Sequence, residues 1–252
     1  MSDYQLHNVD CLEFMRTLPD KSVDAIITDL PYGTTACSWD EIIPFAPMWE
    51  QVNRINKGAF VTTASQPFTS KLIMSNIESF RYEWIWEKNK ATGHAMSKHR
   101  PMKSHENILV FGESLYIPVM EAGKPYKQPR TNPKYDHKIN PAFRTGVNVK
   151  DNTEGGRFPR SVINIKNAYY TDGEQEHPTQ KPVSLFEYLI RTYTNAGDTV
   201  LDFTMGSGTT GVACMRAGRN FIGCDNDTEH GYFQIAEKRI RHASQQMIME
   251  FQ

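Results

Sequence analysis

The sequence predicts an α/β fold built around a doubly wound sheet. Two observations predict this fold class. Short apolar runs alternate with helical patterns over residues 6–111, as in sheets that carry helices on both faces. Far downstream, a strand pattern at residues 199–203 is followed by a glycine-rich loop and another helical pattern. The chain of 252 residues is long enough for one large domain of this kind.

The amino-acid composition excludes several classes of protein. Hydrophobic residues make up 39% of the chain and charged residues 23%, which is ordinary for a globular protein, and the net charge is −1. The four cysteines form no C-x-x-C pair, so neither a zinc ribbon nor a disulfide framework is expected. His94, His99 and His105 lack carboxylate or cysteine partners at the spacing of metal ligands. No apolar run approaches the ~18 residues of a membrane span, and no signal-peptide pattern begins the chain. We expect a reduced, cytoplasmic protein without a metal site.

The elements follow one another in a regular order. Residues 6–9 form a short strand pattern, and Asp10 is placed to cap a helix that begins at Cys11 and ends before Pro19. A buried strand is expected at residues 23–27, where four of five residues are apolar. The remaining expected elements of the first half are helices at 45–54 and 69–77 and strands at 59–63, 82–86 and 107–111.

Residues 113–167 differ in composition and periodicity from the rest of the chain. Proline, asparagine and lysine dominate, and no helical or alternating period persists. Residues 124–166 hold ten Lys or Arg against three acids, interleaved with aromatic residues. A solvated, loop-rich insertion would also fit, but this density of cations and rings favours a surface that binds nucleic acid. Residues 87–103 add five basic residues against the single acid Glu87.

The second strand–loop–helix unit carries a nucleotide-binding pattern. Gly206, Gly208 and Gly211 match the G-x-G-x-x-G spacing between an expected strand and an expected helix at 209–217. A further strand at 220–225 ends in Asp225, nineteen positions after Gly206, where an acid can bind both hydroxyls of a ribose. The pattern indicates a ligand that contains adenosine.

Three ligands of this kind remain: a nicotinamide dinucleotide, a nucleotide phosphate and S-adenosylmethionine. No G-K-[ST] motif supports a phosphate-binding loop. Two further residues separate Asp202 and Phe203 from Gly206, whereas a pyrophosphate site turns almost directly from strand into glycine. The longer loop leaves room for the amino-acid end of a cofactor, with Asp202 placed to bind a positive ammonium group.

Two other segments stand out. The strand at 23–27 leads into Asp29-Leu30-Pro31-Tyr32, which places a carboxylate and an aromatic ring at the edge where open α/β sheets bind ligands. A plain strand and turn would also account for it. Residues 177–182 (His-Pro-Thr-Gln-Lys-Pro) precede an expected helix at 183–194, and proline in the first turn of a helix would also account for that motif.

Taken together, these three motifs resemble the amino-group DNA methyltransferases that use S-adenosylmethionine. Their order, with the catalytic motif first and the glycine loop last, resembles the circularly permuted β group of that family. One position departs from the family pattern, because Leu30 stands where proline is usual. The resemblance implies a Rossmann-like methyltransferase fold with a mostly parallel sheet of about seven strands. It further implies one catalytic domain, residues 1–252, in which residues 113–167 are a target-recognition insertion.

The resemblance also implies the site residues. Asp29, Leu30, Pro31 and Tyr32 would be catalytic. Thr179 and Lys181 would reach the methionine portion of the cofactor, Phe203 would pack on it, and Asp10 and Cys11 would lie near its adenine ring. The full expected cofactor set is Asp10, Cys11, Thr179, Lys181, Asp202, Phe203, Gly206, Ser207, Gly208, Thr209 and Asp225.

The implied activity is methyl transfer to the exocyclic amine of a base flipped out of double-stranded DNA. Aspartate at the first motif position favours adenine-N6 over the alternative, cytosine-N4. The partners would be DNA and at most a second copy of the chain, with no membrane. Two rival classes are a nicotinamide-dependent oxidoreductase, supported by the glycine spacing alone, and a non-catalytic DNA-binding module. An RNA substrate is a further alternative, and the recognised sequence is not predicted.

Overall fold

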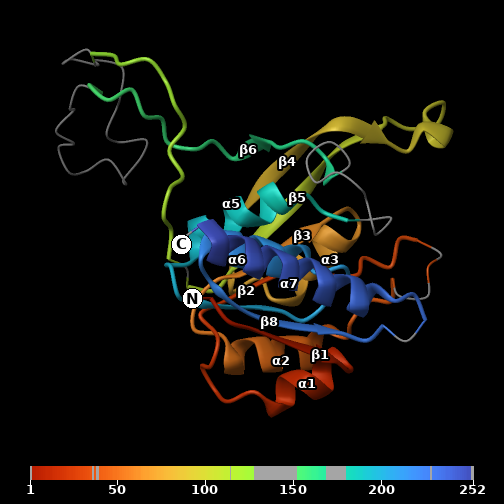
Figure 1. Ribbon diagram of the computed structural model, residues 1–252. Helices are drawn as coiled ribbons and strands as arrows, with labels where there is room; N and C mark the ends of the chain where they lie inside the picture. Colours follow the sequence, from red (N-terminus) through yellow and green to blue (C-terminus); the bar gives the residue numbers. More distant parts are fainter. Residues whose placement is uncertain are drawn as a thin grey trace. The chain divides into compact units, whose positions relative to one another are not determined.

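The computed structural model describes residues 2–35, 37, 40–113, 115–127, 152–168, 180–227 and 229–250. These residues contain one sheet of eight strands in the order β1-β8-β7-β2-β3-β5-β4-β6 (Figure 1). The strands are β1 (Tyr4–Asn8), β2 (Ala25–Asp29), β3 (Phe60–Ala64), β4 (Phe80–Thr92), β5 (Lys103–Phe111), β6 (Val162–Asn164), β7 (Thr199–Asp202) and β8 (Asn220–Asp225). Only β5 runs antiparallel to its neighbours, so the expected mostly parallel sheet is confirmed, with one strand more than the approximate seven.

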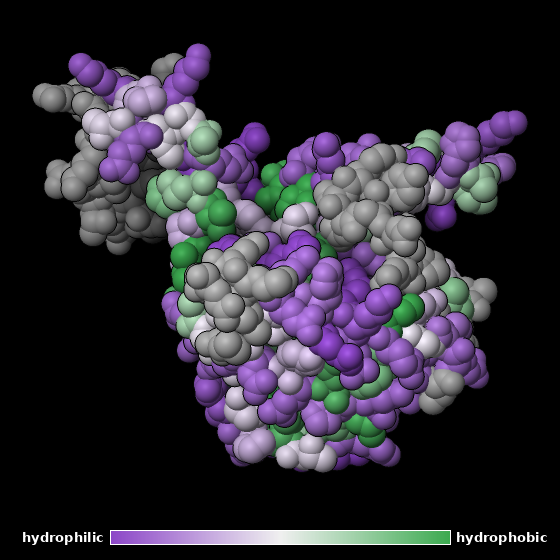
Figure 2. All heavy atoms as spheres, viewed as in Figure 1, coloured by the Kyte–Doolittle hydropathy of each residue, from purple (hydrophilic) through white to green (hydrophobic). Residues whose placement is uncertain are grey.

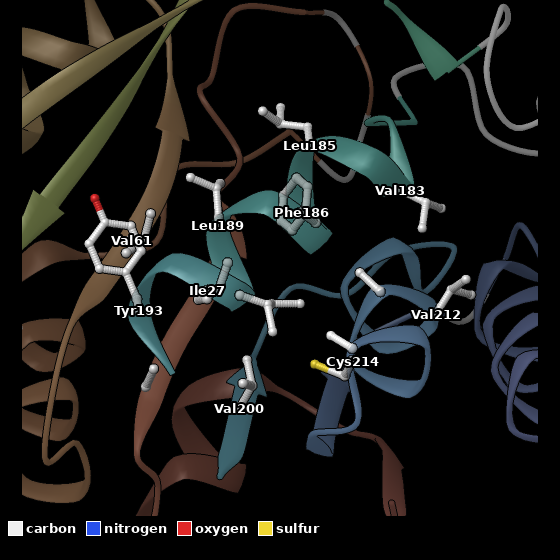
Figure 3. Close-up of a cluster of buried hydrophobic side chains, with 14 of the residues drawn as sticks. Ile27, Val61, Val183, Leu185, Phe186, Leu189, Tyr193, Val200, Val212 and Cys214 are labelled. Atoms are coloured by element: carbon white, nitrogen blue, oxygen red, sulfur yellow. The ribbon is translucent and has the colours of Figure 1, made fainter. Parts of the chain in front are cut away.

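Helices cover both faces of this sheet. They are α1 (Cys11–Thr17), α2 (Phe45–Ile55), α3 (Phe68–Ser75), α5 (Val183–Tyr193), α6 (Thr209–Ala217) and α7 (Tyr232–Glu250), with a 3₁₀ turn η1 (His94–Met96). One core lies between the sheet and α5, α6 and α7 (Figure 3), and the other between the sheet and α1, α2 and α3. Alternation along β2 assigns Ile27 to the first core and Ile26 to the second, which is the doubly wound arrangement expected from the sequence.

Most local elements lie where the sequence predicts them. α6 and β8 have the predicted bounds, and Gly218 ends α6 with φ +74°. Two of the described strands and α-helices were not expected, nor was the short turn η1. β6 falls within the stretch predicted to be loop-rich, because three residues are too few to show an alternating pattern. α7 follows the last predicted strand, and its low mean hydropathy hid a narrow apolar stripe that includes Ala236 and Ile240.

The chain divides into two compact units, residues 1–117 with 161–252 and residues 118–160. In the second unit, Glu121 bridges Arg157 and Tyr126 bridges Asn152 in antiparallel fashion, and the Arg157 guanidinium lies 4.5 Å from the centre of the Tyr126 ring. Residues 128–151, which contain five of the basic residues counted above, lie outside the described part of the chain. The single domain with an insertion at 113–167 therefore stays a prediction.

One face of the described chain is largely polar. Hydrophilic residues predominate on the face shown in Figure 2, with hydrophobic residues scattered among them. Within the described ranges, no helix has both the length and the hydropathy that crossing a membrane requires.

Candidate active site

Four neighbouring strands place polar side chains on the same face of the sheet. Ile27 of β2 lies in the core under α5, and Asp29 follows two residues later at the carboxyl end of the strand. The same two-residue period puts three more polar side chains next to core residues: Thr63 after Val61 on β3, Glu106 before Ile108 on β5, and Lys88 after Trp86 on β4. Strand pairing therefore assembles a polar cluster at this edge of the sheet.

The Asp29 carboxylate is held by three donors. The Tyr32 hydroxyl donates to Oδ1 at 2.9 Å, and the Thr63 hydroxyl donates to the same oxygen. Lys181 Nζ donates to Oδ2 at 2.5 Å. An ionised carboxylate offers about four acceptor positions, and the Asp29 side chain is 26% exposed. It therefore keeps accessible hydrogen-bonding capacity for a ligand.

Lys181 reaches the site from the residue pair that precedes α5. Its ammonium lies 3.7 Å from Glu106 Oε2 and 5.4 Å from the centre of the Tyr32 ring. Burial lowers the pKa of Lys181, but the carboxylates of Asp29 and Glu106 outweigh this and hold the pKa above its usual value, so the side chain stays charged. The structure thus brings Lys181 to the catalytic motif. Its expected contact with a cofactor stays a prediction.

Glu106 is a site residue that the sequence analysis missed. It is 8% exposed, Lys88 donates to its Oε1, and the Tyr32 hydroxyl lies 3.4 Å from its Oε2. Burial raises the pKa of Glu106, but the charges of Lys181 and Lys88 bring it below the usual value. One signal could have revealed it: Glu106 is a charge at a position where the alternation of its strand predicts an apolar residue.

The loop after Asp29 is fixed by Asp40. Its carboxylate accepts the backbone N–H groups of residues 32–35 at 2.7–2.9 Å and the Thr35 hydroxyl at 2.7 Å. Burial raises the pKa of Asp40, but these bonds hold it below its usual value. The Tyr32 ring stacks on Phe68 with 5.3 Å between centroids. Nothing in the sequence pattern singles out Asp40.

The other two residues of the motif, Leu30 and Pro31, differ in their exposure. Leu30 is 3% exposed and packs in the core under α1, α2 and α3, whereas Pro31 is partly exposed. The side chain of Leu30 therefore serves packing, which leaves its backbone carbonyl for the catalytic role that the resemblance implies.

Asp202 ends β7 and is 2% exposed. The hydroxyls of Thr28 and Thr210 donate to its two oxygens at 2.6 and 2.5 Å. Burial raises the pKa of Asp202 to about 7. Phe203 has no exposed surface and stacks on Phe60. The expected contacts of Asp202 with an ammonium group and of Phe203 with a cofactor stay predictions.

The glycines of the loop have two different roles: Gly208 and Gly211 allow close packing of α7, whereas Gly206 faces open space. A Cβ at Gly208 would lie 2.9 Å from Ala236, and one at Gly211 would lie 2.4 Å from Ile240, so α7 requires glycine at both positions. Gly206, with φ +50°, has open space around it. Close approach of a ligand to the backbone is therefore available at Gly206.

Hydrogen bonds with residues outside the loop hold the rest of the glycine loop in place. Asp225 Oδ2 accepts the N–H of Gly206 at 2.7 Å, and burial raises the pKa of Asp225. Ser207 is bound by Arg239, whose Nη1 lies 2.6 Å from the Ser207 carbonyl oxygen. Thr209 is buried, and its hydroxyl donates to the Lys181 carbonyl at 3.4 Å. The loop is thus tied to β8, α7 and the residue that contacts Asp29.

Asp10 and Cys11 lie beside the end of β8. Asp10 Oδ1 accepts from the N–H groups of Leu12 and Glu13 at 2.9 and 3.0 Å, so the predicted helix cap is confirmed. Burial raises the pKa of the Cys11 thiol to about 12. Thr179, with the two residues before it, lies outside the described residues.

Hydroxyl groups connect the two halves of the site. Thr28 on β2 donates to Asp202 on β7, its hydroxyl lies 2.6 Å from that of Thr204, and the Thr204 hydroxyl donates to the Asp29 carbonyl at 3.1 Å. The glycine loop and the catalytic motif are therefore direct neighbours, although 174 residues separate Thr28 from Asp202.

Comparison with known proteins identifies the family of the chain. Residues 23–238 match the DNA methylase family. The type II methyltransferase M1.MboII of Moraxella bovis is 28% identical, over 90% of this chain and 93% of the relative. The DNA adenine methyltransferase YhdJ of Escherichia coli (strain K12) is 28% identical, over 93% of this chain and 82% of the relative.

A solved structure supports the same assignment. The M1.HpyAVI–SAM complex superposes with a TM-score of 0.59 at 27% identity, covering 94% of this chain and 99% of that one. Because the family match includes the catalytic motif, the glycine loop and most of the sheet, the chain belongs to the family of N6/N4 DNA methylases.

Proposed function

We propose that this protein transfers the methyl group of S-adenosylmethionine to the N6 amine of an adenine flipped out of double-stranded DNA. The observation that carries the proposal is the Asp29 carboxylate, which is held by three donors yet remains partly exposed at the carboxyl end of β2. Family membership supports the cofactor and the DNA substrate. The aspartate at the first motif position and the adenine methyltransferase from E. coli support adenine. Cytosine-N4 is the alternative base.

In this reaction the side chains and backbone of the protein position the target amine. An exocyclic amine is a poor nucleophile because its lone pair is delocalised into the ring. Asp29 accepts a hydrogen bond from one amine N–H and the Leu30 carbonyl accepts one from the other, which favours a pyramidal nitrogen whose lone pair is free for in-line attack. S-adenosylmethionine, when bound, supplies the electrophilic methyl group. Stacking of Tyr32 on the flipped base, for which Lys181 and Phe68 position its ring, belongs to the same proposal.

The residues of the glycine loop suit S-adenosylmethionine. Open space at Gly206 admits a ligand next to the backbone, and Asp225 lies beside it at the end of β8 to accept ribose hydroxyls. Asp202 offers negative charge for the ammonium of the methionine portion. Asp10 and Cys11, at the start of α1, would border the adenine.

Methyl transfer itself tests the function. We expect tritium from labelled S-adenosylmethionine to enter double-stranded DNA and to be recovered as N6-methyladenine after digestion to nucleosides. Recovery as N4-methylcytosine would overturn the assigned base. Failure of label to enter DNA would overturn the activity, and label in RNA would overturn the substrate. A cytoplasmic location and a monomer or homodimer complete the proposal.

DNA binding should depend steeply on salt because of the basic residues between 124 and 166. Each phosphate neutralised contributes about −0.9 to the slope of log affinity against log salt. We expect the double substitution Lys124→Gln and Lys127→Gln to flatten this slope. The matched control is Lys71→Gln with Arg216→Gln, two exposed cations on α3 and α6. Equal slopes in the two double variants, measured by fluorescence anisotropy, would locate the DNA elsewhere.

Cofactor affinity should increase with pH because of Asp202. Its pKa is raised to about 7 by burial, and a cofactor ammonium beside it favours the ionised form. Affinity should therefore rise between about pH 6 and pH 8, and Asp202→Asn should lose that part of the rise. Calorimetry on both proteins isolates this contribution, because the cofactor's own amine titrates identically in each. Identical pH profiles would contradict the contact between Asp202 and the ammonium.

A further inference from the structure

Two acids and two lysines form a compact charge cluster around the catalytic motif. Lys181 lies 2.5 Å from Asp29 Oδ2 and 3.7 Å from Glu106 Oε2, and Lys88 binds the other oxygen of Glu106. The side chains of Lys88, Glu106 and Lys181 are each 10% exposed. The two acids cancel the two cations. Lys103 also acts on Glu106, but it is exposed, so water screens its charge.

Glu106 contacts both lysines of the cluster. Besides its two lysines, its Oε2 lies 3.4 Å from the Tyr32 hydroxyl, which itself donates to Asp29. The proposed function gives this arrangement a chemical consequence. As the target amine attacks, positive charge grows on its nitrogen, next to Asp29. Lys181 opposes that charge unless a second acid compensates for it.

Resting on the proposed function, we infer that Glu106 is a positioning residue for methyl transfer. It holds Lys181 beside Asp29 and cancels the charge of one lysine, so that Asp29, Glu106, Lys88 and Lys181 together carry no net charge when the amine becomes positive. Asp29 alone cannot compensate for the positive amine, because the negative charge of Asp29 is already balanced by the positive charge of Lys181. Glu106 lies on β5, outside all three sequence motifs.

The first test is Glu106→Gln, which keeps the shape of the side chain and removes its charge. We expect kcat to fall roughly 10- to 100-fold, while KM for DNA and Kd for S-adenosylmethionine change less than about threefold. The matched control is Glu87→Gln on neighbouring β4, where an exposed glutamate accepts from Asn164 at 3.2 Å. Circular dichroism confirms folding of both. A Glu106→Gln enzyme with the kcat of wild type would overturn the inference.

The second test separates charge from packing. Adding Lys88→Met to Glu106→Gln restores neutrality but removes one more polar contact. If charge balance matters, the double variant should recover at least about tenfold of the lost kcat. A purely structural role predicts that it is no better than Glu106→Gln, and that result would overturn the inference. Wild-type enzyme without methyl transfer to DNA would instead refute the proposed function, so the two failures are distinct.

Discussion

Alanine in place of Asp29 should abolish methyl transfer while binding of S-adenosylmethionine survives. In the proposed mechanism the carboxylate contacts the target amine, and removing one such preorganised group lowers kcat by roughly 10²–10³-fold. The glycine loop is held by Asp225, Arg239 and packing against α7, none of which depends on the Asp29 side chain. Single-turnover methyl transfer and calorimetry of cofactor binding, run on the same preparation, measure the two effects separately.

The substitution also leaves Lys181 without its closest anion, so folding needs its own control. Breaking a buried ion pair from one side costs about 3–5 kcal/mol, although partial exposure of Asp29 moderates this cost. Asp29→Asn keeps the shape of the side chain, and the double variant Asp29→Ala with Lys181→Met removes the uncompensated cation. Both should fold, bind cofactor and remain inactive. If cofactor affinity fell as far as activity in all three variants, the catalytic assignment of Asp29 would be wrong.

Lys181→Met should lower kcat and leave the cofactor affinity nearly unchanged. The ammonium bonds to Asp29 and lies beside Glu106, and without it the Asp29 carboxylate loses a bond that orients it toward the amine. If the full cost of a hydrogen bond to a charged group, about 1.5–3 kcal/mol, is lost from the transition state, kcat falls roughly 10–150-fold. The resemblance to the methyltransferase family instead implies that Lys181 reaches the methionine portion of the cofactor. That role predicts that Lys181→Met has a larger Kd for S-adenosylmethionine and an unchanged kcat. The split between the two constants decides which role is correct.

The chain offers a matched control at the opposite end of the same strand. Lys57 Nζ lies 2.8 Å from Asp24, the residue before β2, and the Lys57 side chain is 49% exposed against 10% for Lys181. Lys57→Met therefore removes a lysine–aspartate bond of similar length without touching the site, and it should leave kcat and Kd unchanged. A loss of kcat in Lys57→Met equal to that in Lys181→Met would indicate a general effect on β2.

Local elements could be read from the sequence because their signals are local. The glycine at the end of α6, the acid that caps α1 and the apolar run before Asp29 each determine structure within a few residues. β4 could not be read in full, since its second half, up to Thr92, gains its partner by pairing with β5 rather than by burial. β6 likewise depends on a parallel partner, β4, that lies about 80 residues earlier in the chain.

The site residues were also predictable only where a local motif contains them. Motifs predicted Asp29, Tyr32 and Lys181, and the structure brings these three together. Glu106 and Lys88 were missed because they join the site through strand register, which no single segment encodes. Asp40 was missed because its five bonds depend on the folded path of its own loop.

The strand order also determines when the protein becomes competent during its synthesis. β1 pairs with β8 from Tyr4 to Asn8, and β2 pairs with β7 through Ala25 and Ile26. At roughly 5–20 residues per second, a ribosome needs on the order of 10–40 s to make the ~200 residues between these partners. Until then β1 lacks its neighbour and β2 can pair only with β3. A nascent chain therefore carries Asp29, the proposed catalytic residue, long before the glycine loop and β8 exist, and on the proposed function activity can begin only after the last quarter of the chain has emerged.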